Sequence, residues 1–132
     1  MAKIMVIDDE ADVLLLVEAI LTRAGHEVST CSSGLETLKK LGLQPDDASA
    51  ELPDLLVLDI MMPKMDGYSV ITMVRDNPRT RAIPILVISA LDKIPRSSSS
   101  PVLMDGYLTK PFTHKDLFGN VEKLLKGRKA QA

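Results

Sequence analysis

Three short stretches of the chain are apolar at every position, and they constrain the fold more than any other feature of the sequence. They are residues 4–7 (IMVI), 55–58 (LLVL) and 85–88 (ILVI). Strands without polar alternation are typical of a parallel sheet that is covered on both faces. Residues 26–30 are more polar, which suits an edge strand, and residues 106–108 are predicted to form a short fifth strand.

Amphipathic segments separate these strands. Apolar residues recur at helical spacing in residues 11–24, 34–41 and 67–76, and again in residues 113–126 after the last strand. Strands that alternate with helices of this length predict right-handed βαβ units. The predicted fold is therefore a doubly wound α/β fold of the (βα)₅ type with a five-stranded parallel sheet. Ligands of such sheets lie beyond the carboxyl ends of the strands.

The segment between the fourth and fifth strands departs from this pattern. Residues 91–105 contain Pro95, Pro101 and four consecutive serines. A proline inside a helix costs about 3 kcal/mol, and serine prefers caps and turns. We therefore expect any fourth helix to be short or irregular.

Composition excludes several classes of function. A net charge of −2 and only 3% aromatic residues provide neither a cationic field nor stacking platforms, so direct nucleic-acid binding is not expected. No apolar run reaches the length of a membrane span, and the first residues lack the pattern of a signal peptide. We expect one domain over residues 1–127 with a basic tail at 128–132, and a cytoplasmic location.

The cysteine and the histidines do not indicate a metal site. Cys31 has no second cysteine to pair with, which agrees with a reducing compartment, and we expect it to be a small buried apolar residue. His26 and His114 lie far apart without repeated ligand spacing, so we expect surface or capping positions for both rather than zinc binding.

Polar residues follow the strands at the predicted carboxyl edge of the sheet. The first strand is followed by Asp8 and Asp9, the third by Asp59, the fourth by Ser89, and the fifth by Lys110. Crowded carboxylates repel one another and raise each other's pKa unless a cation compensates. Mg²⁺ prefers hard oxygen ligands, and together with Lys110 it would supply the positive charge.

Each of these residues also has an ordinary structural explanation. Asp8 and Asp9 suit the start of a helix, where a side-chain oxygen can cap and negative charge is favoured. Asp59 suits a turn, Ser89 a hydrogen-bonded strand end, and Lys110 a solvated surface. The residue types alone leave these alternatives open, and their joint order at one edge favours a common site.

Four segments together resemble the signature segments of response-regulator receiver domains. They read VIDDE at 6–10, LDIMMPKMDG at 58–67, ISA at 88–90 and YLTKPF at 107–112. The resemblance covers nearly the whole chain and preserves the spacing between the acidic pair, the acceptor, the hydroxyl and the lysine. It implies a flavodoxin-like fold with strand order 2-1-3-4-5.

The resemblance implies a phosphorylation-dependent signalling switch rather than an enzyme with an external substrate. Asp59 would accept a phosphoryl group from a histidine kinase or a phosphotransfer protein. Lys110 and Ser89 would bind phosphoryl oxygens, and Tyr107 would turn as the conformational switch. The changed surface would act on a downstream protein target or on an effector domain that this sequence does not include.

Mg²⁺ is the cofactor that the resemblance implies. The direct ligands would be Asp9, Asp59 and the backbone carbonyl of Met61, and Asp8 would act largely through a metal-bound water. The resemblance further implies a cis peptide bond between Lys110 and Pro111.

Two other classes of function remain as alternatives. Phosphatases and phosphotransferases with an aspartyl nucleophile typically carry an acidic residue two positions later, where this chain has Met61, which cannot donate a proton. A receiver-like interaction module that has lost phosphorylation would not need the acidic pair, Asp59 and Lys110. The residues present argue against both.

Overall fold

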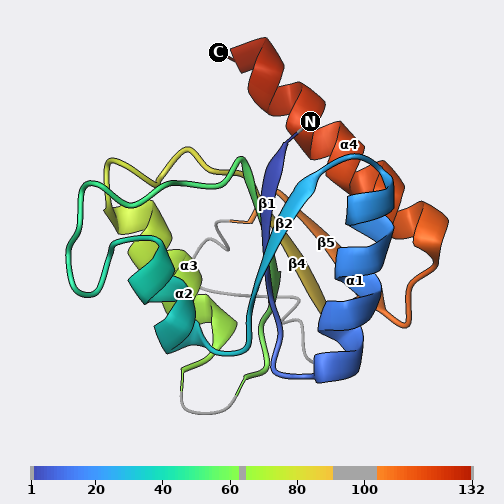
Figure 1. Ribbon diagram of the computed structural model, residues 1–132, viewed down its shortest axis with the longest axis horizontal. Helices are drawn as coiled ribbons and strands as arrows, with labels where there is room; N and C mark the ends of the chain where they lie inside the picture. Colours follow the sequence, from blue (N-terminus) through green and yellow to red (C-terminus); the bar gives the residue numbers. More distant parts are fainter. Residues whose placement is uncertain (1, 63–64, 91–103, 132) are drawn as a thin grey trace, which may run out of the picture.

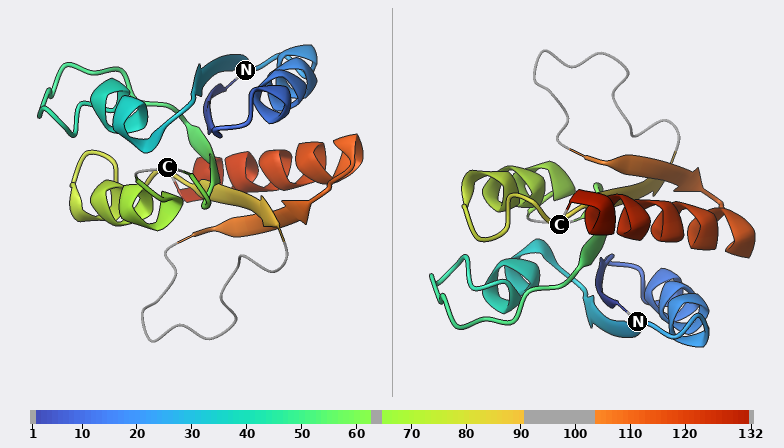
Figure 2. Two further views of the ribbon diagram at one scale, coloured as in Figure 1. Left: turned by 90° about the horizontal axis from the view of Figure 1, so that it is seen from below. Right: turned by 90° about the horizontal axis from the view of Figure 1, so that it is seen from above.

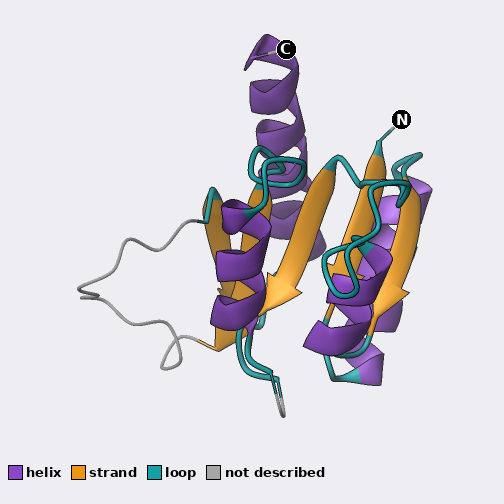
Figure 3. Ribbon diagram, turned by 90° about the vertical axis from the view of Figure 1, so that its left-hand side faces the viewer, coloured by secondary structure: helices purple, strands orange, loops and turns teal. Residues whose placement is uncertain are grey.

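Five parallel strands form one sheet in the order β2-β1-β3-β4-β5 within the computed structural model, which describes residues 2–62, 65–90 and 104–131, with the backbone alone for 128–131. The strand arrows point to the same end of the sheet (Figure 3). The predicted order is confirmed, and β2 lies at an edge as its polarity indicated. The strands are β1 Lys3–Ile7, β2 Glu27–Cys31, β3 Leu55–Asp59, β4 Ile85–Ala90 and β5 Gly106–Lys110.

Helices cover both faces of the sheet (Figures 1 and 2). In the described part of the chain, α1 and α4 pack on one face and α2 and α3 on the other. No helix in this part has the length and apolar character required to cross a membrane. The helices are α1 Ala11–Arg23, α2 Gly34–Lys40, α3 Gly67–Asp76 and α4 His114–Gln131.

The C-terminal helix is longer than the sequence pattern indicated. It ends at Gln131 rather than near residue 126, so the predicted boundary between domain and basic tail falls inside α4. Figure 1 shows its last turns extending past the sheet. The amphipathic pattern stops where α4 leaves the sheet, which explains why periodicity underestimated its length. The short or irregular fourth helix expected in 91–105 lies almost entirely outside the described residues.

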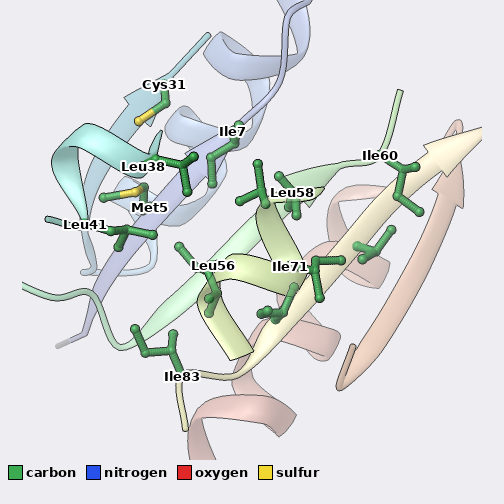
Figure 4. Close-up of a cluster of buried hydrophobic side chains, with 14 of the residues drawn as sticks. Met5, Ile7, Cys31, Leu38, Leu41, Leu56, Leu58, Ile60, Ile71 and Ile83 are labelled. Atoms are coloured by element: carbon green, nitrogen blue, oxygen red, sulfur yellow. The ribbon is translucent and has the colours of Figure 1, made fainter. Parts of the chain in front are cut away.

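The core consists of two apolar layers, one on each face of the sheet. Side chains of a strand alternate between faces: on β1, Ile4 and Val6 pack toward α1 and α4, whereas Met5 and Ile7 pack toward α2 and α3. Figure 4 shows the layer that faces α2 and α3. Burying an aliphatic side chain of this size contributes about 1.5–3 kcal/mol, so the two layers fix the strands in register.

That register brings the strand ends to the same level. Ile7 pairs with Leu58, so the residues that follow, Asp8 and Asp59, emerge side by side. Ser89 and Lys110 come from the ends of β4 and β5, the next two strands. Asp8, Asp59, Ser89 and Lys110 therefore all lie at the carboxyl ends of their strands.

Gly67 fixes how the chain turns from β3 into α3. A Cβ atom at this position would lie 2.6 Å from the Ile60 Cα and 2.7 Å from the Asp59 carbonyl oxygen. The Gly67 amide donates to the Ile60 carbonyl at 2.7 Å. The absence of a side chain lets α3 begin against the segment that follows Asp59, while the side chain of Asp66 caps the helix by accepting from the Ser69 amide.

We predict that Gly67→Ala destabilises the protein by about 1–3 kcal/mol, because the added methyl group meets backbone that cannot move aside freely. The matched control is Gly119→Ala. Gly119 lies inside α4 with nothing within 4 Å of the added Cβ, so alanine there should stabilise the helix by about 1 kcal/mol. Urea denaturation measures both. Equal effects of the two substitutions would contradict this account of Gly67.

Candidate functional site

Four carboxylates gather at the carboxyl edge of the sheet. Asp8, Asp9, Glu10 and Asp59 each offer one oxygen, and these oxygens lie within 4.8 Å of one another. Asp8 is 0% exposed and Asp59 is 3% exposed, whereas Asp9 and Glu10 are exposed to solvent. The cluster therefore combines two buried carboxylates with two that are open to solvent.

Backbone amides orient the two buried carboxylates. Oδ1 of Asp8 accepts from the Glu10 amide at 2.9 Å, and Oδ1 of Asp59 accepts from the Met61 amide at 3.2 Å. Aspartates commonly bond the backbone two residues ahead in this way. The turn-forming explanation thus accounts for Oδ1 of Asp59 and not for its second carboxylate oxygen. Helix capping by Asp8 or Asp9 is wrong, because α1 has Glu10 at its N-cap and no side-chain cap hydrogen bond.

Lys110 reaches the cluster from β5, an edge strand of the sheet. Its Nζ lies 3.0 Å from Asp8 Oδ2, 3.3 Å from Asp59 Oδ2 and 3.3 Å from Glu10 Oε1. Its side chain is only 19% exposed, so the solvated-surface explanation is wrong. The Lys110–Pro111 peptide bond is cis, as the resemblance implied.

The buried carboxyls hold their protons more tightly than usual. Burial raises the pKa of Asp8 and of Asp59, and each is raised further by a neighbouring carboxylate: Asp59 acts on Asp8, and Asp9 acts on Asp59. Lys110 and the backbone amides oppose this without cancelling it. For Lys110, burial favours the neutral amine, but the hydrogen bond to Asp8 and the charges of Asp8 and Asp59 outweigh it and raise the pKa. Repulsion was expected from the sequence, but burial is the larger cause.

The remaining predicted residues lie on β4, on β5 and just after β3. Ser89 is 1% exposed, and its buried Oγ has no hydrogen-bond partner among the described residues. Within the described residues, its side chain therefore makes no hydrogen bond of the kind expected for a hydrogen-bonded strand end. Tyr107, on the neighbouring strand β5, is 51% exposed, and the Met61 side chain is 49% exposed.

Two residues differ from the sequence-based expectation. Glu10 was not predicted to belong to the site, although it directly follows Asp9 and could have been suspected from that position alone. His26 is not at the surface. Its side chain is 9% exposed, its Nε2 contacts Glu122 Oε2 at 2.9 Å, and its Nδ1 accepts from the Ala2 amide at 3.2 Å. Cys31 is buried as expected.

A family model described as the response regulator receiver domain matches residues 4–122. The chain belongs to this family. The fold and the order of the site residues agree with that membership, which confirms the resemblance seen in the sequence motifs. Receiver domains are phosphoacceptor signalling modules of two-component systems rather than conventional enzymes.

Named relatives place the receiver domain within longer proteins. The chain is 37% identical over 125 residues to the alkaline phosphatase synthesis transcriptional regulatory protein PhoP of Bacillus subtilis, covering 94% of this chain and 48% of that protein. It is 42% identical over 127 residues to the response regulator PleD of Caulobacter vibrioides, covering 93% and 26%. The chain thus spans about half of these relatives or less.

A solved structure matches over nearly its whole length. It is a CheY-like response regulator receiver domain protein from Methanospirillum hungatei, with a TM-score of 0.78 and 28% identity, covering 97% of each chain.

We predict that Asp59→Asn stabilises the metal-free protein at neutral pH. Because the pKa of Asp59 is raised on folding, the folded state favours its protonated form, and the wild type loses stability as pH rises from the unfolded-state value near 3.8 through the folded-state pKa. Asparagine carries no charge and avoids this loss. Urea denaturation in EDTA should show the variant more stable at pH 7 and the difference shrinking toward pH 4. A variant that is less stable at pH 7 would show that the ion pair with Lys110 outweighs burial.

Proposed function

We propose that this receiver domain is a phosphorylation-dependent switch in which Asp59 accepts a phosphoryl group from a histidine kinase or a phosphotransfer protein. The observation that carries the proposal is the arrangement of Asp59, which is buried, contacts Lys110 and belongs to an oxygen cluster suited to a divalent cation. Asp59 also occupies the acceptor position of the motif that runs from 58 to 67.

The chemistry is the transfer of a phosphoryl group between two nucleophiles. A carboxylate oxygen of Asp59 forms a bond to phosphorus while the bond from phosphorus to the donor's histidine nitrogen breaks, and the product is an acyl phosphate. Charge in the transition state spreads over three equatorial oxygens, so catalysis depends on positioning and neutralisation. Lys110, held beside Asp59 at 3.3 Å, supplies one positive charge for those oxygens.

The residues at the site fit Mg²⁺. The donors are hard carboxylate oxygens that lie within 4.8 Å of one another, and among the described residues one lysine balances four carboxylates there, which leaves negative charge uncompensated. Asp9, Asp59 and the Met61 backbone carbonyl would hold the ion directly, and Asp8 through water. When bound, Mg²⁺ would neutralise phosphoryl oxygens during transfer.

Ser89 and Tyr107 would convert the new charge into a change of surface. The Ser89 Oγ is buried without a partner among the described residues, and an unsatisfied buried hydroxyl costs free energy. A phosphoryl oxygen would give this hydroxyl an acceptor. Tyr107 is 51% exposed, and movement near Ser89 would open space for its ring to turn inward.

The partners follow from the proposed chemistry. The donor would be a phosphohistidine protein, and the target would be a downstream protein or an effector domain joined to the receiver domain. Turnover of an external phosphoester is not part of the proposal. We also propose a cytoplasmic location, because the buried, unpaired thiol of Cys31 agrees with a reducing compartment.

We predict that acetyl phosphate with Mg²⁺ adds one phosphoryl group to the wild type, detected by intact mass, and that Asp59→Asn abolishes the addition because an amide is not a competent nucleophile. Asp76→Asn is the matched control, since Asp76 is exposed at the end of α3, and it should react like the wild type. EDTA should suppress the reaction. Undiminished labelling of Asp59→Asn, or no labelling of the wild type, would refute the proposal, and the second result would favour an unphosphorylated interaction module.

A further inference from the structure

Glu10 makes a contact that the start of α1 does not explain. It is the N-cap residue of α1, yet its side chain makes no cap hydrogen bond. Its Oε1 instead lies 3.3 Å from Nζ of Lys110, which is 100 positions away in the sequence. The side chain is therefore directed to the site and not to the helix.

The contact completes the hydrogen bonding of Lys110. An ammonium group has three N–H donors, and the structure gives Lys110 three carboxylate partners, Asp8, Asp59 and Glu10. Every donor is engaged in the unphosphorylated protein. A phosphoryl oxygen can bind Lys110 only if one carboxylate gives up its donor.

The three partners differ in how easily they can leave. Asp8 has the shortest contact, 3.0 Å, and its side chain is 0% exposed, so losing Lys110 would leave its buried charge uncompensated at a high cost. Asp59 would itself carry the phosphoryl group. The Glu10 side chain is 60% exposed, and exposed ion pairs are weak enough that solvation replaces them at a cost of less than about five-fold in an equilibrium constant.

We infer that Glu10 is a positioning residue that occupies the third donor of Lys110 before phosphorylation and releases it to a phosphoryl oxygen afterwards. The inference rests on the proposed function. Glu10 acts through Lys110, and it opposes phosphoryl binding because its contact must be broken first. Removing it should make the phosphorylated geometry easier to reach.

The test is the affinity for beryllofluoride, a phosphoryl mimic, measured by calorimetry on the whole chain at saturating Mg²⁺. Glu10→Gln should bind beryllofluoride about two- to five-fold more tightly than the wild type, as expected for loss of one exposed competing ion pair. The control is Asp12→Asn, which removes the same charge from an exposed position in the first turn of α1, outside the cluster. Its affinity should change less than that of Glu10→Gln.

Measuring the same affinities in a Lys110→Ala background distinguishes an effect of the contact between Glu10 and Lys110 from a long-range effect of charge. There, Glu10→Gln should give no gain beyond that of Asp12→Asn, because the shared partner is gone. The inference is overturned if the two substitutions have equal effects in the wild-type background, or if the extra gain persists without Lys110. It is also overturned if Glu10→Gln weakens Mg²⁺ or beryllofluoride binding, which would make Glu10 a metal ligand. A wild type that binds no beryllofluoride with Mg²⁺ would refute the proposed function itself.

Discussion

The contact of Lys110 with two buried carboxylates is the interaction on which the site depends. Lys110 is the last residue of β5, which is an edge strand next to β4. Its side chain nevertheless reaches past β4 to Asp59 on β3 and to Asp8, which follows β1. Without it, two buried carboxyls would face each other with no compensating charge, an arrangement that is strongly unfavourable. The ammonium group therefore connects the two halves of the sheet at the end where the chemistry is proposed to occur.

The charge balance of the cluster is incomplete, and that is the basis of its proposed function. Among the residues that the structure describes, one lysine is set against four carboxylates, and burial raises the pKa of both Asp8 and Asp59. Buried carboxylates that repel one another are unfavourable, so binding a cation lowers the free energy of the site. In the proposed switch a phosphoryl group would add negative charge, which bound Mg²⁺, a reorganised Lys110 and the Ser89 hydroxyl, without a partner among the described residues, would accommodate. Under the proposed function, this locally unfavourable burial of charge is what lets the site respond to its ligands.

Most of the fold could be predicted because the relevant signals are local. Three uninterrupted apolar runs indicated covered parallel strands, and the motifs placed Asp8, Asp59, Ser89 and Lys110 at one edge. Geometry that depends on distant residues could not be predicted. The burial of His26 against Glu122 and the turn of Glu10 toward Lys110 arise from tertiary packing, which neither periodicity nor capping preference encodes. The end of α4 past residue 126 was missed because the helix continues there without an amphipathic pattern.

A crystal structure with Mg²⁺ and beryllofluoride tests the central claim most directly. The account predicts beryllofluoride bound to an Asp59 carboxylate oxygen, with Lys110 Nζ and Ser89 Oγ each within hydrogen-bond distance of a fluoride and Mg²⁺ held by the neighbouring carboxylates. Beryllofluoride bound at another residue, or bound at Asp59 with Lys110 still engaged by all of its present carboxylate partners, would contradict it.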